Sequence, residues 1–475
     1  MATFIGIASL VAAFPLNSLA QATAPGKPGE LGHEVIEAMK RATDYYRTKV
    51  ARHGGYVYYT SEDLSERWGE GKATPDQIWV QPPGTPTVGM AYLAAYDATK
   101  DPAFLGAAWE AAQALVKGQL ESGGWTNSID FAASGRNAAR YRKLPGGLRN
   151  HSSLDDGISQ NALRFLMRMD RAQEERDEVI HEAVQYGLEA LLKAQLPNGG
   201  FSQGWSGPAV DHPVVKASYP DYDWRAENRI KNYWDLPTLN DDLATHLIAT
   251  LDEAWRTYRD ERFKDAIERF GEFLLLAQMP DPQPAWAQQY DHAMRPVWAR
   301  KFEPPAIAGR ESQGVLRTLL EIHRITRDGK FLQPIPSALD YLERSLLPDK
   351  QLARYYELKT NRPLYMTRDY TLTYDDSDVP KHYGWKSAAK LESIRSRYAA
   401  QRQGKFPEPS RAKKISEAKV RAILDALDSE GRWMSEEDGA TLVGQPKFGA
   451  GMRFLSSEVF SKNLETLSAY IATNP

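Results

Sequence analysis

Hydrophobic residues recur at every third or fourth position in four paired segments along the middle of the chain. The pairs occupy residues 88–125, 154–201, 240–286 and 309–357, and each ends in a loop marked by Gly or Pro or by aromatic residues. This period is that of amphipathic helices. One helix pair cannot bury both of its faces, so successive pairs stack side by side. We therefore predict a mainly α fold, an α/α toroid-like array of helix pairs with long loops and short β segments.

The composition changes after residue 385. The chain becomes polar and rich in Lys and Arg, and helical periodicity returns at residues 415–427 and 459–471. We expect an α/α domain over residues 31–385 and a C-terminal helical appendage over residues 386–475, which could pack on the same domain.

The N-terminus resembles a secretory signal peptide. An apolar stretch over residues 4–14 precedes Ser18, Leu19 and Ala20, although no basic residue stands before it. The stretch is too short to span a membrane, and no later segment is long and apolar enough to do so. We expect residues 1–22 to be a signal peptide and the protein to be secreted or periplasmic. Residues 35–50 then predict a helix, and residues 55–79 an aromatic loop or short hairpin.

The charge balance argues against one class of function. The chain has 59 Lys and Arg against 62 Asp and Glu, a formal net charge of −3, whereas nucleic-acid binders rely on an excess of basic residues. There is no Cys, so a metal has to be held by oxygen or imidazole ligands. We expect no nucleic-acid partner, no membrane partner and a monomeric protein.

Two of the predicted helices begin with paired aspartates, Asp155 and Asp156 in one and Asp241 and Asp242 in the other. Carboxylate oxygens select calcium or magnesium, and arginines in neighbouring loops can bind the carboxylates of an anionic substrate. Aspartates at helix starts are also favoured as plain N-caps. At this point the residues allow both interpretations.

Several short motifs follow one another in a distinctive order. They read Leu154-Asp155-Asp156-Gly157, Gln195-Leu196-Pro197-Asn198-Gly199-Gly200-Phe201, Leu239-Asn240-Asp241 and Trp286-Ala287-Gln288-Gln289-Tyr290-Asp291. The longest spans residues 299–312 and has the form Ala-Arg-x-x-Glu-x-Pro-x-x-x-Gly-x-Glu-Ser. After it come Ala353-Arg354-Tyr355-Tyr356-Glu357, Thr360-Asn361-Arg362-Pro363 and Arg368-Asp369.

In this order the motifs resemble those of the pectate lyases of polysaccharide lyase family 10, over roughly residues 155–385. The resemblance implies a calcium-dependent enzyme that cleaves α-1,4-linked polygalacturonate by β-elimination and releases unsaturated oligogalacturonides. Such an enzyme removes a weakly acidic proton from C5 of a uronate, and a metal that neutralises the uronate carboxylate assists that step.

The resemblance also implies roles for single residues. Asp155 and Asp241 would hold the calcium ion, and Arg300 would be the base, with Arg310 as the second candidate. The implied substrate-binding residues are carboxylate clamps, a sugar platform and two polar loop residues, namely Arg354, Arg368, Trp286, Asp291 and Asn240. Trp125, Phe201 and Tyr356 are further possible sugar platforms. For these three rings and for Trp286, a place in the hydrophobic core is an equally well-founded interpretation.

The chain departs from the family pattern in several places. Asp156 stands where the family has Asn, Phe201 where it has Trp, Ala287 where it often has Cys and Tyr290 where it has His. An insertion rich in Trp, Tyr and Pro occupies residues 202–239. Substrate range and the number of subsites can therefore differ.

Two other functions stay open from the residues alone. A glycoside hydrolase on an α/α barrel would use Asp155 and Asp241 as its two carboxyl groups, without calcium or an arginine base. A carbohydrate-binding solenoid would use the arginines only to bind uronate carboxylates. Formation of an unsaturated product distinguishes a lyase from both.

Overall fold

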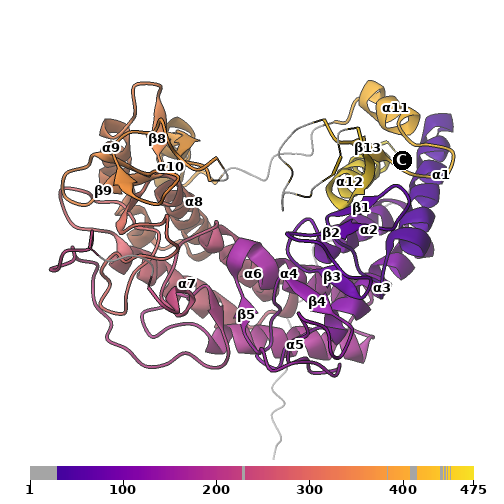
Figure 1. The fold of residues 1–475 in the computed structure, drawn as a ribbon, viewed down its shortest axis with the longest axis horizontal. Coiled ribbons are helices and arrows are strands. Elements are labelled where there is room, and N and C mark those ends of the chain that lie inside the picture. The colour runs from indigo at the N-terminus through magenta and orange to yellow at the C-terminus, as the bar shows by residue number, and fades with distance from the viewer. Residues whose placement is uncertain are drawn as a thin grey trace, which may run out of the picture.

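The computed structural model describes residues 29–474 except 227–229, 382, 407–413, 439–441, 443–445, 447 and 450. Twelve α-helices lie in this described part, and they follow an open arc with two arms (Figure 1). One continuous cluster of buried apolar side chains runs through the helix pairs and fixes their packing.

The predicted helix pairs form two layers. The first helices of the pairs stand side by side, each in contact with the next, and they are α2 (Thr85–Thr99), α4 (Ile158–Ala172), α6 (Leu243–Tyr258) and α8 (Gly309–Thr326). The second helices pack against them, and they are α3 (Pro102–Lys117), α5 (Glu178–Lys193), α7 (Glu261–Ala277) and α9 (Ile335–Arg344). The mainly α, toroid-like array of helix pairs is thus confirmed.

The chain ends add helices at both ends of the first layer. At one end α12 (Ser457–Thr473) packs on α2 and on α1 (Glu30–Tyr45), and α11 (Glu417–Asp425) contacts both α1 and α12. At the other end α10 (Leu391–Arg402) packs on α8 and α9. The helix α10 lies in a segment where we expected no helix, because only Leu391, Ile394 and Gln401 of it are buried and its apolar pattern is weak. The domain boundary at residue 386 stays a prediction.

The near-identical loop sequences of the first two pairs make identical contacts. The side-chain amide of Gln119 donates to the carbonyl oxygens of Gly123 and Ala183, and that of Gln195 donates to those of Gly199 and Ala266. Each glutamine therefore ties its own loop to the second helix of the next pair. The sequence repeat reflects this repeated connection between neighbouring pairs.

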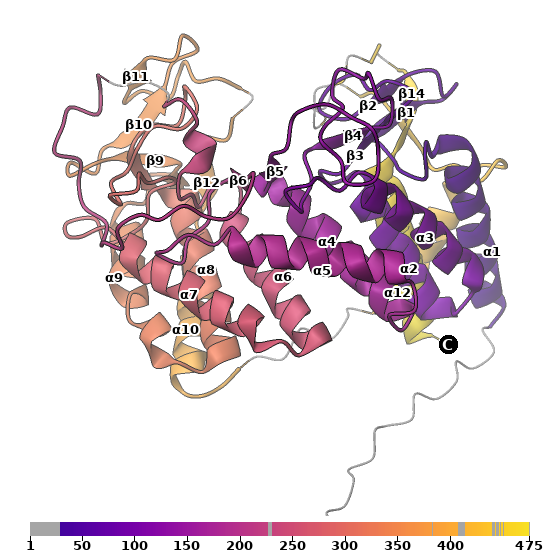
Figure 2. The ribbon, with the colours of Figure 1, turned by 90° about the horizontal axis from the view of Figure 1, so that it is seen from below.

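Short strands collect on one side of the helix layers, where the long loops lie (Figure 2). One sheet joins β13 (Met434–Glu436), β14 (Arg453–Ser456), β1 (Tyr59–Ser61) and β2 (Arg67–Trp68), and another joins β11 (Leu372–Thr373), β10 (Pro363–Met366), β9 (Tyr355–Glu357) and β7 (Ala306–Ala308). Three two-stranded sheets pair β12 (Lys386–Ala388) with β8 (Gln351–Ala353), β3 (Gln77–Trp79) with β4 (Ser128–Asp130), and β5 (Ser152–Ser153) with β6 (Gly204–Trp205). We call this side the loop face.

Within the described residues, we find no helix that combines the length and the hydropathy needed to cross a bilayer. The predicted signal peptide, residues 1–22, lies outside the described residues.

Candidate active site

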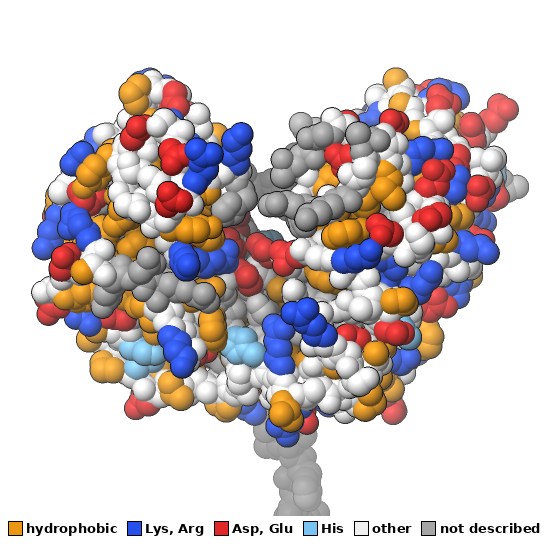
Figure 3. All heavy atoms as spheres, in the orientation of Figure 1, with side chains coloured by type: hydrophobic (Ala, Val, Ile, Leu, Met, Phe, Trp, Pro, Cys, Tyr) orange, Lys and Arg blue, Asp and Glu red, His pale blue; other side chains and the backbone are white. Residues whose placement is uncertain are grey.

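Three carboxylates from two helix starts meet on the loop face. Asp155 and Asp156 belong to a 3₁₀ turn, Asp155–Gly157, that leads into α4, and Asp241 immediately precedes the N-cap of α6. One oxygen from each of the three lies within 4.8 Å of the others. The space-filling view shows a hollow between the two arms, with acidic side chains at its centre (Figure 3). The structure thus brings together the two residues predicted to hold calcium.

The backbone at these helix starts is left-handed. Asp156, Asp241 and Asp242 have φ values of 45°, 50° and 55°, and no side chain caps α4 or α6. A non-glycine residue in this region costs about 1–3 kcal/mol, and such residues occur at functional sites as well as at turns and helix ends. The next residue, Gly157, also has positive φ, 72°. Only glycine fits there without strain, because a Cβ would lie 2.6 Å from the side-chain amide nitrogen of Asn161. The aspartates are therefore not plain helix caps.

Crowding of like charges disfavours ionisation of the cluster. Desolvation, together with the charge of Asp241, raises the pKa of Asp155 well above its usual value. Desolvation and Asp241 likewise raise the pKa of Asp156 to about 6. One buried oxygen of Asp155 has no hydrogen-bond partner. A cation between the carboxylates would relieve both their repulsion and this unsatisfied oxygen.

Arg300 is the cation that the chain itself places against this cluster. Its Nη2 atom lies 3.0 Å from Oδ2 of Asp241 and 3.6 Å from Oδ1 of Asp155, and its Nε lies 3.6 Å from Oε2 of Glu303. Desolvation lowers the pKa of the Arg300 guanidinium, but the surrounding carboxylates outweigh this effect and raise it above its usual value. Without ligands Arg300 is therefore firmly protonated.

The Arg-x-x-Glu motif has a direct geometric explanation. Residues 299–303 form a tight turn in which Ala299 N–H donates to the carbonyl of Glu303, and Glu303 N–H donates to the carbonyl of Arg300. The carboxylate of Glu303 then accepts from the backbone N–H of Arg300 at 2.9 Å. Glu303 is only 2% exposed, and the hydroxyl of Tyr383 donates to its other oxygen. The motif therefore fixes both the backbone and the charge of Arg300.

Of the predicted substrate-binding residues, Arg354 lies beneath the cluster. It is 4% exposed and donates to the carboxylate of Glu311 at 2.9 Å, while Tyr383 covers its guanidinium at 4.3 Å. A second nitrogen contact reaches Oδ1 of Asn240 at 3.5 Å, and Asn240 in turn donates to Asp241 at 2.5 Å. In this structure Arg354 supports the cluster through Asn240 and presents no free face for a substrate carboxylate.

The suggested aromatic platforms are core residues. Trp286 is fully buried, and its indole N–H donates to the carbonyl of Leu274. Trp125, Phe201 and Tyr356 are no more than 1% exposed. None of these rings offers a face to a sugar in this structure.

The remaining predicted residues occupy three different surroundings. Arg310 pairs with Asp242 at 2.8 Å, directly beside the cluster. Asp291 receives two hydrogen bonds from Arg295 and makes no recorded contact with the cluster in the described part of the chain. Arg368 is largely exposed and pairs with Asp378.

Two residues that the sequence did not single out complete the site. Gln81, between β3 and α2, is 5% exposed and donates from one amide nitrogen to Asp156 at 2.8 Å and to Glu70 at 2.9 Å. Tyr233, from the insertion, lies close enough to Arg300 to act on its pKa. A lone Gln far outside the motifs carries no signal in a single sequence. Tyr233 could have been found only as one of many aromatics in the insertion.

Comparison with known proteins found one family model and several solved structures that this chain resembles. Residues 119–351 match a family model described as pectic acid lyase, and this range contains the aspartates and Arg300. No curated protein matches. A family 10 polysaccharide lyase from Cellvibrio cellulosa, solved with a bound trigalacturonic acid, is 20% identical at a TM-score of 0.46, over 67% of this chain and 98% of that one. A cellobiose 2-epimerase from Spirochaeta thermophila is 16% identical at a TM-score of 0.44, over 93% of this chain and 98% of that one.

The family-model match gives residues 119–351 the sequence of a polysaccharide lyase. Within that class, the region 119–351 belongs to the pectic acid lyases, and the resemblance read from the motifs is confirmed.

Proposed function

We propose that the protein is a calcium-dependent pectate lyase that cleaves α-1,4-linked polygalacturonate by β-elimination and releases unsaturated oligogalacturonides. The observation that carries this proposal is a trio of carboxylates whose oxygens lie within 4.8 Å of one another, two of which, Asp155 and Asp241, contact Arg300. A cluster of this kind supplies ligands for a cation and a charged group for an anionic substrate in one place.

The donor set fits calcium. Calcium binds oxygen ligands at about 2.3–2.6 Å, so two ligands of one ion can stand up to about 5 Å apart. Asp155, Asp156 and Asp241 satisfy this condition, and they leave room for substrate carboxylates and water in a shell of six to eight oxygens. When bound, calcium would neutralise the uronate carboxylate and favour charge build-up there during removal of the C5 proton.

The residues of the chain perform the other tasks. Asp155 and Asp241 hold the guanidinium of Arg300 charged as long as they are its partners. If these carboxylates bind a cation instead, their effect on Arg300 weakens, and its pKa falls toward the range in which a neutral guanidine can accept the C5 proton. A free guanidinium has a pKa of about 12.5–13.8, so we expect the reaction to favour alkaline pH.

Glu303 and Arg354 position the reacting groups. Glu303 holds the backbone of Arg300 in place, and its buried carboxylate stays bonded to Tyr383. Arg354 holds Asn240, which orients Asp241. Arg310, paired with Asp242, is the second candidate for the base, and Arg368 and Asp291 remain proposed contacts for uronates further along the substrate.

One assay tests the proposal. Polygalacturonate is incubated with the protein in calcium, in excess chelator, and in chelator followed by excess calcium, while ultraviolet absorbance of unsaturated uronides is recorded. We expect product with calcium, none with chelator, and recovery after calcium is restored. Reducing ends without unsaturation would identify a hydrolase. Full activity in chelator would remove calcium from the mechanism.

A further inference from the structure

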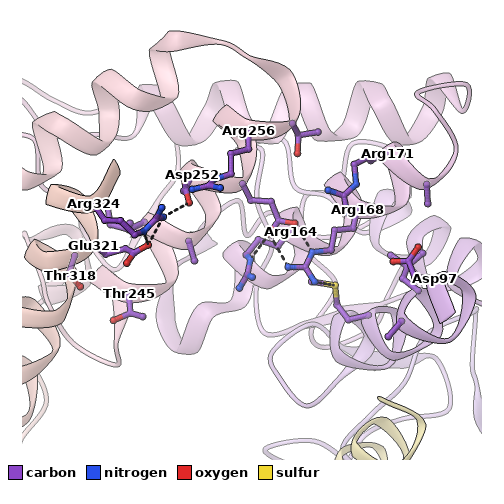
Figure 4. Close-up of a pocket in the computed structure, with 18 of the residues that line it drawn as sticks. Asp97, Arg164, Arg168, Arg171, Thr245, Asp252, Arg256, Thr318, Glu321 and Arg324 are labelled. Carbon is purple, nitrogen blue, oxygen red and sulfur yellow. Dashed lines mark hydrogen bonds and ion pairs between the residues drawn. The ribbon is translucent and has the colours of Figure 1, made fainter. Parts of the chain in front are cut away.

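A large groove runs along the concave side of the helix array. It has a volume of about 1170 Å³ and is lined by residues of α2, α4, α6, α8 and α10 (Figure 4). Many of its charged lining residues come from the C-terminal halves of these helices, whereas the catalytic carboxylates stand before the first turns of α4 and α6. The groove is therefore distinct from the site described above. We call it the arginine groove.

Its charge is opposite in sign to that of the whole chain. Seven arginines and five acidic residues line it, an excess of positive charge on a chain whose net charge is −3. A helix dipole favours basic residues near C-terminal ends, but that effect acts on each helix alone. It does not explain guanidinium groups from four helices in one concave surface. A concave surface concentrates the field of such charges and attracts anions.

Two of the carboxylates are each shared between two arginines. Glu253 lies 2.9 Å from Arg164 and 2.5 Å from Arg168. Asp252 lies 2.9 Å from Arg256 and 3.2 Å from Arg324. A carboxylate shared by two guanidiniums balances only one of their two positive charges and leaves each with unused N–H donors. These donors are available to a further anion.

The third shared carboxylate is Glu321, 2.6 Å from Arg324 and 2.5 Å from Arg397. Two more lining arginines, Arg171 and Arg317, have no recorded ion pair among the described residues. Their positive charge is therefore uncompensated by a direct partner.

The groove also has the shape and composition for a sugar chain. Met90, Ala94 and Ala249, which are partly exposed, provide apolar surface between the arginines, and such surface suits the C–H faces of pyranose rings. On α6 the lining begins at Thr245, in the first turn of the helix and three residues after the N-cap Asp242, which neighbours Asp241 of the candidate active site. A chain that leaves the catalytic site therefore meets the groove within one helical turn.

We propose that the arginine groove is a second binding site for an acidic uronate oligosaccharide, which holds the part of the polysaccharide that lies beyond the catalytic subsites. The proposal rests on the proposed function, because it takes the same substrate class. Arginine forks bind the repeated carboxylates, and the apolar surface carries the sugar rings.

The test compares two double variants of equal charge change. The groove variant combines Arg171→Glu with Arg256→Glu. The control variant combines Arg41→Glu with Arg259→Glu; Arg41 and Arg259 are exposed and do not line the groove. Binding of an oligogalacturonate of about ten residues is measured calorimetrically in excess chelator, where no turnover is expected. We expect the groove variant to bind about tenfold more weakly than wild type, because it loses two exposed ion pairs with carboxylates of the oligosaccharide. We expect the control variant to bind as tightly as wild type.

Kinetics separate this proposal from the proposed function. In calcium, we expect the groove variant to raise KM for polygalacturonate while its kcat and its turnover of trigalacturonate stay unchanged. Arg171→Gln, which breaks no ion pair among the described residues, repeats the test if the double variant fails to fold.

Equal binding by the groove variant and the control variant, with an active wild type, overturns the proposed second binding site but not the proposed function. Equal binding of polyglutamate and oligogalacturonate overturns the assignment to a uronate sugar. An inactive wild type refutes the proposed function instead.

Discussion

Aspartates that precede helices behave differently at the two ends of the helix pairs. Before the second helices α3, α5 and α7, Asp101, Asp177 and Asp260 have extended backbone with φ between −75° and −91°, and each side chain accepts a backbone N–H as an N-cap. Before the first helices, Asp156 and Asp241 have φ of 45° and 50°, and neither caps a helix. The same residue at a similar position thus stabilises the fold in one place and stores strain in the other.

The difference shows which carboxylates are available to a ligand. A capping carboxylate is satisfied by the helix and is unavailable to a ligand. Asp156 and Asp241 have left-handed backbone and cap no helix; they meet Asp155 in the cluster, where Arg300 contacts Asp155 and Asp241. The positive φ values are a local cost that leaves these ligand atoms exposed to the hollow.

The largest effect is expected from Asp241→Ala compared with Asp260→Ala. Loss of the Asp241 carboxylate removes a cation ligand and a partner of Arg300, so activity should fall by at least about 10²-fold. Asp260→Ala should keep its activity per folded molecule and lose about 0.5–2 kcal/mol of unfolding free energy, because a cap is lost. Initial rates and thermal denaturation measure both. Equal loss of activity in the two variants would contradict the distinction.

Arg300→Lys tests the residue that the carboxylates surround. If Arg300 removes the C5 proton, kcat should fall by at least about 10²-fold with little change in KM. The same substitution at Arg310 is the comparison, and a kcat-only defect there would transfer the role of base to Arg310. Arg354→Lys should instead reduce stability, because the planar guanidinium that pairs with the buried carboxylate of Glu311 is lost. A rise in KM alone for Arg300→Lys would show that it binds substrate only.

Gln81→Ala asks whether residues outside the family match support the cluster. Without the amide that joins Glu70 and Asp156, we expect calcium affinity to fall by about tenfold, the lower end for groups that orient a metal ligand. Gln81→Glu also loses the donor but adds a negative charge that attracts calcium, so its calcium affinity should fall less than that of Gln81→Ala. Calorimetric titration of calcium into each protein gives the result. Unchanged affinity in both variants would show that Gln81 only fills space.

The smallest effect is expected from Asp156→Asn, which restores the family residue. In the metal-free protein the raised pKa of Asp156, about 6 against a usual 3.8, means that its ionisation destabilises the fold. The variant should gain about 1 kcal/mol at pH 8, well below the full value of the shift, because water screens this exposed side chain. The gain should shrink as pH falls through about 6 and vanish below about 4. A gain independent of pH would exclude this electrostatic cause.

The sequence by itself determined the helix pairs, the repeated loops and the order of the motifs. These features follow from local rules. The spacing of apolar residues predicts each helix, and the repeated loops are visible because Gln119 and Gln195 each precede a similar glycine-rich loop in consecutive helix pairs. The Arg-x-x-Glu motif is equally local, since a tight turn brings Glu303 back onto Arg300. The α/α array could therefore be predicted from the chain alone, and the resemblance of the motifs supplied the catalytic candidates, whose roles stay predictions.

Only the tertiary structure decided which side chains are available for binding. The sequence does not reveal that Trp286 and Arg354 are buried, because aromatic rings and arginines occur both in cores and in binding sites. It does not reveal that Gln81 reaches Asp156 from a distant part of the chain, nor that arginines from four helices line one groove. Such contacts join residues far apart in sequence, and they form because packing of the helix layers, rather than any local preference, fixes where the helix ends and the loops between them meet.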